Sequence, residues 1–365
     1  VARYFLEQLV CENLEIEDAR RKNYALYHVN AAQESVEKFN SNSALFEYIK
    51  ALKIYPLNLE VRLSYANWLL NEGYPEAFLS QLKFIETQGV VSQTVSDKIE
   101  SYDSLLENTI ANRWDLDPFY LDKSRISIGL YYKNDNVTLL HPDSSKVCAS
   151  LIADSFSAFP YFNVSAYQNS VKSYSQAFNN ARKSNYDYFG IVNFDENERE
   201  NSISIDLYVT ATGSLAKKWN VYRTGNKKLF AAVEKLVLDM VSSFETRGKI
   251  LQRKSNQVLI DLGKRDGITL DSYFVVAKKD EVKIADSGIG LILSEDMELG
   301  FVELIEVGED ISVGTFVQKG FYDKMNPNDE IFLVAKDTDK EKSSNLKAQP
   351  EKTSPELLEM LNSIK

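Results

Sequence analysis

The chain has too few histidines and cysteines for most metal centres and disulfide frameworks. His28 and His141 are its two histidines, and two cannot supply a multi-histidine metal site. Cys11 and Cys148, its two cysteines, lie far apart and form no Cys-x-x-Cys pair, so neither a zinc site nor a redox motif is indicated. We therefore expect two buried thiols, no bound metal and no cofactor. Such sparse cysteine fits the cytosol, or an envelope protein whose cores fold without disulfides.

An excess of positive charge and a long apolar run are also missing. The chain has 42 Lys and Arg residues against 53 Asp and Glu, a net charge of −11, and its pI is near 5.0. This charge repels a phosphate backbone, so no nucleic-acid partner is expected. No run approaches the ~20 apolar residues of a transmembrane helix. The chain opens with Val1 rather than Met, so we expect a processed or trimmed product that has lost any export signal.

Familiar catalytic motifs are absent as well. The Gly288-Ile289-Gly290 stretch has Leu293 where a dinucleotide-binding loop needs its third glycine, and no Walker loop, Gly-x-Ser-x-Gly elbow or His-Glu-x-x-His motif is found. His141 precedes Pro142 at an expected helix start, where a packing role is favoured. The acidic run at residues 195–200 lacks the central glycine of a calcium loop and fits a solvated hairpin. We predict no catalytic residue, and therefore no enzyme.

The sequence does contain enough apolar material for several domains. Its 365 residues are 44% hydrophobic and 26% charged, and domains of roughly 150 residues would give two or three of them. The patterns predict four segments. These are a helical region at residues 1–120, an α/β domain at 125–247, a small β-barrel at 248–335 and a charged tail at 336–365 with a short amphipathic helix.

The helical region has a repeat with a period close to about 34 residues. The positions that form the pattern are Ala44, Tyr48, Ala51 and Pro56 in one unit, and Tyr65, Ala66, Leu69, Gly73, Tyr74 and Ala77 in the next. Small alanines allow helices to approach closely, while a glycine permits the turn and a proline ends a helix. The pattern resembles tetratricopeptide repeats, flanked by helices at 2–14 and 96–110. An arbitrary helical bundle is the competing interpretation. Because three repeats are usually needed, further repeats are expected before Val1.

Residues 125–247 alternate between strand and helix patterns in the order βαβαβββα. This order predicts a compact α/β sandwich in which helices cover one face of a mixed sheet. The clearest strand, at residues 202–211, places Ile203, Ile205, Leu207 and Val209 on one face. An apolar stripe at helical spacing then predicts a long helix from Leu229 to the region of Phe244.

From Gly248 onward the helical patterns disappear and short strands recur about every ten residues. The expected strands are at residues 258–261, 273–277, 290–293, 301–307, 314–317 and 331–334, with glycines between them. This spacing predicts a small antiparallel barrel.

The two later domains together resemble a known bacterial family. Residues 248–276, with Gly263 and Gly267, resemble the C-terminal barrel of the flagellar assembly protein FlgT, and residues 326–331 resemble its closing turn and strand. Residues 271–272 are Asp-Ser, where such barrels often have glycine. The preceding α/β segment is similar to the middle domain of FlgT and to the N-terminal domain of the periplasmic protein TolB. Tetratricopeptide-like repeats stand where FlgT has its own N-terminal domain.

This resemblance implies a periplasmic, non-enzymatic scaffold in a flagellar motor collar or ring. Its implied partners are other envelope or flagellar motor proteins, and self-assembly into a ring is a further expectation. The family has no catalytic residue to carry over. An envelope binding module, such as an activator of cell-wall synthesis, is the alternative, and an enzyme with an unrecognised site is a third hypothesis.

Two sets of residues are predicted to bind partners. If Leu59 opens a repeat, then Glu60, Leu63, Asn67 and Leu70 lie along its concave side. Leu63 stands where carboxylate-binding repeats have lysine, so a partly apolar partner is expected there, unless other parts of the chain cover this face.

The second set lies in the tail. Ser354 can cap a short helix that starts at Pro355. The apolar stripe of that helix is formed by Leu357, Leu358, Leu361 and Ile364. Such a helix is too short to be stable alone, so we expect it to dock in a groove on its own α/β domain or on a neighbouring subunit. A disordered tail with a chance stripe is the competing interpretation.

Overall fold

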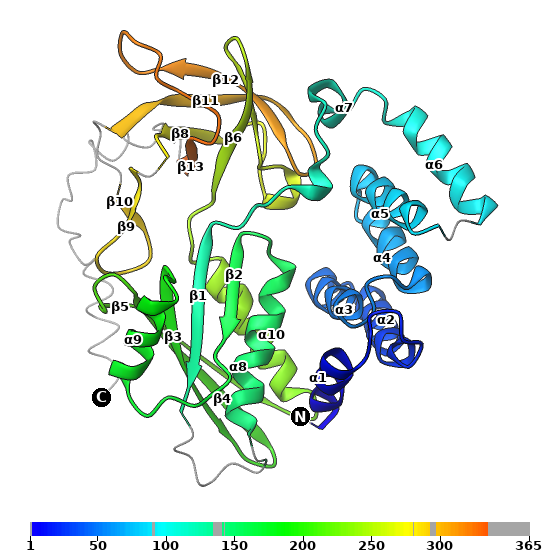
Figure 1. The fold of residues 1–365 in the computed structure, drawn as a ribbon, viewed down its shortest axis with the longest axis vertical. Coiled ribbons are helices and arrows are strands. Elements are labelled where there is room, and N and C mark those ends of the chain that lie inside the picture. Colours follow the sequence, from blue (N-terminus) through cyan, green and yellow to red (C-terminus); the bar gives the residue numbers. More distant parts are fainter. Residues whose placement is uncertain are drawn as a thin grey trace, which may run out of the picture.

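Helices come first along the chain and sheets follow (Figure 1). The computed structural model describes residues 2–89, 92–133, 141, 143–279, 281–292 and 297–334. The predicted tail helix and its four apolar residues lie outside these ranges. Within them, no helix is both long and apolar enough to cross a membrane.

The N-terminal region is helical, as predicted. Its helices are α1 (Ala2–Asn13), α2 (Arg21–Glu37), α3 (Ser41–Ile54), α4 (Leu59–Asn71), α5 (Pro75–Thr87), α6 (Gln93–Leu105) and α7 (Ile110–Trp114). The side chains of Asn40 and Asn58 accept hydrogen bonds from the first turns of α3 and α4, which explains where these helices begin. The helix expected at 96–110 is wrong in its bounds, because it ends at Leu105 and a separate short helix begins at Ile110.

Small residues bring the helices of this region close together. Ala25 and Ala32 of α2 and Ala44 and Ala51 of α3 have no exposed surface. The rings of Tyr48, Tyr65 and Trp68 fill the space beside them. Gly73 adopts a φ of +89°, which favours glycine, and so turns the chain from α4 into α5.

A five-stranded mixed sheet follows the helical region. Its elements are β1 (Ile126–Tyr132), α8 (Ser144–Ser155), β2 (Phe162–Ala166), α9 (Tyr174–Lys183), β3 (Tyr188–Glu196), β4 (Glu200–Val209), β5 (Leu215–Thr224) and α10 (Lys228–Val241). The strand order is β2-β1-β3-β4-β5; the first three are parallel and the last three are antiparallel. Ile203, Ile205, Leu207 and Val209 are all buried in the core under α8 and α10.

Helices cover both faces of this sheet, which corrects the expectation that one face alone is covered. Ala177 and Ala181 of α9 pack with Tyr131, Phe189 and Ile191, which point away from α8 and α10. Since β1 and β3 carry apolar residues at successive positions, both of their faces must be buried.

The last domain is a closed barrel, and in the described residues it has six strands. They are β6 (Arg247–Lys254), β7 (Gln257–Ile260), β8 (Tyr273–Ala277), β11 (Glu298–Val307), β12 (Ser312–Gln318) and β13 (Glu330–Val334), in the order β11-β12-β7-β6-β13-β8. All neighbours are antiparallel. Strand β6 was not predicted, because Ile250 is its one fully buried apolar residue and charged residues occupy half of its positions.

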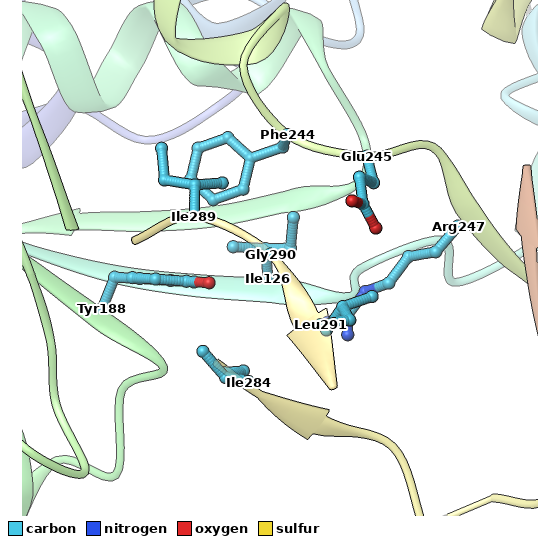
Figure 2. Close-up of a pocket in the computed structure, with 9 residues that line it drawn as sticks. All are labelled: Ile126, Tyr188, Phe244, Glu245, Arg247, Ile284, Ile289, Gly290 and Leu291. Carbon is cyan, nitrogen blue, oxygen red and sulfur yellow. The ribbon is translucent and has the colours of Figure 1, made fainter. Parts of the chain in front are cut away.

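The strand expected at residues 290–293 is not part of the barrel. Instead β10 (Leu291–Ile292) pairs with β9 (Lys283–Ile284) in a separate hairpin. Ile284 and Ile289 pack against the core of the α/β domain, beside Tyr188 and Phe244 (Figure 2). The cavity at this seam is about 20 Å³, room for roughly one water molecule. The hairpin therefore fastens the barrel to the α/β domain.

We expect Gly263→Ala to destabilise the protein. A Cβ at Gly263 would lie 2.4 Å from the carbonyl oxygen of Glu309, so the backbone of one loop would have to move. Overpacking of this kind costs roughly 1–3 kcal/mol, measurable as a lower midpoint of thermal unfolding by circular dichroism. Gly290→Ala is the control, because a Cβ there meets nothing within 4 Å. Equal midpoints for the two variants would contradict the close approach of the loops.

Candidate interaction cleft

The four residues predicted to bind a partner lie on one side of α4. Glu60 is exposed and its carboxylate lies 3.0 Å from the Nζ of Lys22. Asn67 is exposed, whereas Leu63 and Leu70 are half-buried against an apolar cluster formed by α4, α5 and α6. None of the four lines either of the two cavities described next. Their role in binding stays a prediction.

A different side of α4 faces a cavity of about 480 Å³, which we call the Lys123 lobe. Its helical wall includes Trp68 and Glu72, together with residues of α3 and α5. The opposite wall is formed by Phe159 and Tyr161, which follow α8, and by loops of the barrel. The segment that joins α7 to β1 closes one side with Phe119, Leu121 and Lys123. Segments that are far apart in the sequence therefore line one cavity.

A second cavity, of about 450 Å³, adjoins the first and is called here the Phe84 lobe. Both cavities are lined by Ser80, Pro118, Phe119 and Asp310. The Phe84 lobe is otherwise lined by α5, α6, α7 and the segment after α7. The two lobes together are the cleft.

Ion pairs at the floor of the Lys123 lobe bind the segment after α7 to the barrel. The Nζ of Lys123, a residue that is 5% exposed, donates to a carboxylate oxygen of Asp266 at 2.9 Å and to the carbonyl oxygen of Asp310 at 2.9 Å. The guanidinium of Arg265 lies 3.0 Å from the carboxylate of Asp310. Removing one member of a buried pair leaves an uncompensated charge, so the loss of either charge would destabilise this junction.

The carboxylate of Glu309 joins the barrel to the N-terminus of α5. It accepts hydrogen bonds from the backbone N–H groups of Glu76 and Ala77, each at 2.8 Å, and Glu309 is 5% exposed. These amides belong to the first turn of α5, where N–H groups lack partners within the helix and the dipole favours negative charge. Burial raises the pKa of Glu309, while the two N–H groups oppose this shift.

Three further contacts hold the helical region in place. Ile110 and Trp114 of α7 are buried against Leu259, Ile311 and Val313 of the barrel. On the α/β domain, the hydroxyl of Tyr4 donates to Asp154 of α8 at 2.7 Å. Phe46 of α3 meets Phe159 edge to face, with ring centroids 5.8 Å apart. The helical region therefore contacts both later domains at further points.

The two cysteines and His28 are buried or half-buried. Burial raises the pKa of the Cys148 thiol, and Cys11 is half-buried. His28 is buried with its ring nitrogens 2.5 Å from a carboxylate oxygen of Glu47 and 3.1 Å from one of Glu7. Burial lowers the pKa of His28, but these two carboxylates raise it more. Among the described residues, no three His, Cys, Asp or Glu side chains are grouped as metal ligands.

Comparison with known proteins finds relatives for the α/β segment. Residues 125–242, which span β1 to α10, match the family model described as TPASS_0648 family, second domain. No curated protein matches the chain.

Two solved structures of PelC from Paraburkholderia phytofirmans are similar to the chain: a dodecamer of a single-substitution variant, and another PelC dodecamer. Both are 17% identical to the chain and cover 33% of it, with 90% and 88% of PelC matched and TM-scores of 0.26. The LpoB C-terminal domain from Salmonella enterica is 11% identical, covers 34% of the chain and 98% of its own length, and has a TM-score of 0.23.

Replacing Glu76 with glutamine should stabilise the protein at alkaline pH. Burial, together with the nearby charges of Glu309 and Asp310, raises the pKa of Glu76 to about 7. In the unfolded chain the carboxyl ionises near 4.5, so the folded state loses stability as the pH rises from about 4.5 to 7. Glutamine removes this loss. We expect a gain of about 1–2 kcal/mol in the free energy of unfolding at pH 8, reduced by partial exposure, and little gain at pH 5.

The measurement is urea unfolding at both pH values. Glu86→Gln, which changes an exposed carboxylate on the same helix, is the matched control. A Glu76→Gln variant that follows the control at both pH values would contradict the raised pKa.

Proposed function

We propose that the chain is a non-enzymatic scaffold that binds other proteins, with the cleft as its docking site. The observation that carries this proposal is the bond between Glu309 and the N-terminus of α5. It holds one wall of the cleft to the barrel, so a partner meets a surface that is already formed. Rigid surfaces bind with a smaller loss of conformational entropy than mobile ones.

The helical region supports this role as a set of tetratricopeptide-like repeats. The pairs α2–α3 and α4–α5 each bury small residues at the contact, including Ala44, Ala51, Ala66 and Ala77. Gly73 and Pro75 stand at the turn between the helices of the second pair. Stacked helix pairs of this kind present extended surfaces suited to binding proteins. The order βαβαβββα likewise supports an α/β sandwich, with α9 on its second face.

The setting that we propose is the periplasmic collar or ring of a flagellar motor. It rests on the resemblance of residues 125–335 to the middle and C-terminal domains of FlgT. The partners would be other envelope or motor proteins, or further copies of the chain arranged in a ring.

Deletion of the gene tests this setting in the organism that carries it. We expect loss of motility and loss of ring density in images of the motor. Leu45 and Ile49 line the Lys123 lobe, so a gene with Leu45→Glu and Ile49→Glu should fail to restore motility. Leu215→Glu, at an exposed position on β5, is the control and should restore it. Protein levels are compared by immunoblot, so that loss of folding is recognised.

A motile deletion strain with intact rings would refute the flagellar role. A defect in cell-wall synthesis in that strain would instead support the alternative of an envelope binding module.

A further inference from the structure

The Phe84 lobe is lined by five acidic side chains. They are Glu76, Asp103, Asp115, Asp117 and Asp310, and among the described residues that line this lobe, Lys83 is the one cation. The net charge of the lining therefore has the same sign as that of the whole chain, which is −11. A cleft lined by one sign of charge concentrates the field and attracts ligands of the opposite sign.

Internal pairing neutralises part of this charge. The carboxylate of Asp103 lies 2.6 Å from the Nζ of Lys83, and that of Asp310 lies 3.0 Å from Arg265. Glu76, Asp115 and Asp117 form no ion pair within the part of the chain that the structure describes. Asp115 and Asp117 are exposed on the segment after α7, so a ligand can reach both.

An apolar wall stands beside these carboxylates. The rings of Phe84 and Phe119 have centroids 5.7 Å apart, and Phe119 meets Tyr120 edge to face at 5.1 Å. Tyr120 is 71% exposed. Leu79 and Leu106 complete the wall. An exposed aromatic surface binds apolar side chains and also attracts cations through the faces of its rings.

We propose that the Phe84 lobe binds an amphipathic segment of a partner protein that carries lysine or arginine. Its apolar side chains would pack on Phe84, Phe119 and Tyr120, and its cations would lie near the free carboxylates of the lobe. This inference rests on the proposed function, because it names the chemistry of the partner that the cleft receives. A purely apolar partner would leave Asp115 and Asp117 without compensation, and an acidic one would be repelled.

Two synthetic peptides of equal length test the proposal on the full chain. One alternates leucine and lysine at helical spacing, and the other has glutamate in place of every lysine. We expect the lysine peptide to bind in fluorescence anisotropy, more weakly as salt is added, and the glutamate peptide not to bind. Equal binding of the two peptides would overturn the proposal.

The contribution of the carboxylates is measured with Asp115→Asn combined with Asp117→Asn. Asparagine keeps the capping ability of Asp117, whose side chain accepts from the N–H of Phe119 at 2.9 Å. The affinity for the lysine peptide should fall about three- to tenfold. Asp195→Asn with Asp271→Asn removes the same charge at exposed positions that do not line the lobe, and should leave the affinity nearly unchanged. Equal losses for both double variants would place binding elsewhere.

Proton release gives an independent readout. A cation near Glu76 favours its ionised form, so binding at pH 7 should release protons and the heat of binding should vary with the ionisation enthalpy of the buffer. Glu76→Gln should remove this dependence. A buffer dependence that survives in Glu76→Gln would contradict the placement of the cation.

The tail of the chain itself is the rival occupant. If the full chain binds the lysine peptide only after Leu357→Asp and Leu361→Asp, the tail fills the lobe and the proposal of a partner is overturned. These results do not depend on motility. A chain that binds no peptide while the Leu45→Glu and Ile49→Glu variant still fails in cells would refute the partner chemistry and leave the scaffold role standing.

Discussion

The bond between the Glu309 carboxylate and the first turn of α5 is the interaction on which the arrangement of the domains depends. It joins backbone N–H groups of the helical region to a barrel loop that lies 233 positions later in the sequence. Burying a carboxylate is costly unless its oxygens are hydrogen-bonded, and here each oxygen accepts an N–H at 2.8 Å. A cap of this kind contributes on the order of 1–2 kcal/mol. Its larger effect is to fix the orientation of α5.

This contact also explains the electrostatics of the surrounding cleft. Burial raises the pKa of Glu76, and the negative charge of the Glu309 carboxylate beside it raises that pKa further. Lys123 and Arg265 balance the neighbouring acids on the barrel side, so the floor of the cleft is paired while its outer part stays acidic. A close approach of loops makes the contact feasible, because Gly263 leaves room for the backbone of Glu309.

The differences from the sequence-based expectations have physical causes. Repeat spacing predicts a binding face of α4 at Glu60, Leu63, Asn67 and Leu70, and this stays a prediction. The cleft lies on another side of α4. Spacing within one helix does not show which side another domain approaches. Strand β6 was missed because alternation was the criterion, and charged residues near both ends of this strand weaken its alternation. The second covered face of the sheet was foreseeable from β1, whose residues are apolar at successive positions.

The sequence by itself determined the order of helices before strands, the buried alternation of Ile203 to Val209 and the acidic character of the chain. These features follow from neighbours a few residues apart, because backbone periodicity and net charge are local or additive properties. Only the tertiary structure decided where the cleft lies, which carboxylates remain free in it and which helix end Glu309 caps. Such contacts join segments separated by long stretches of chain, and no periodicity along the sequence records how folded surfaces meet.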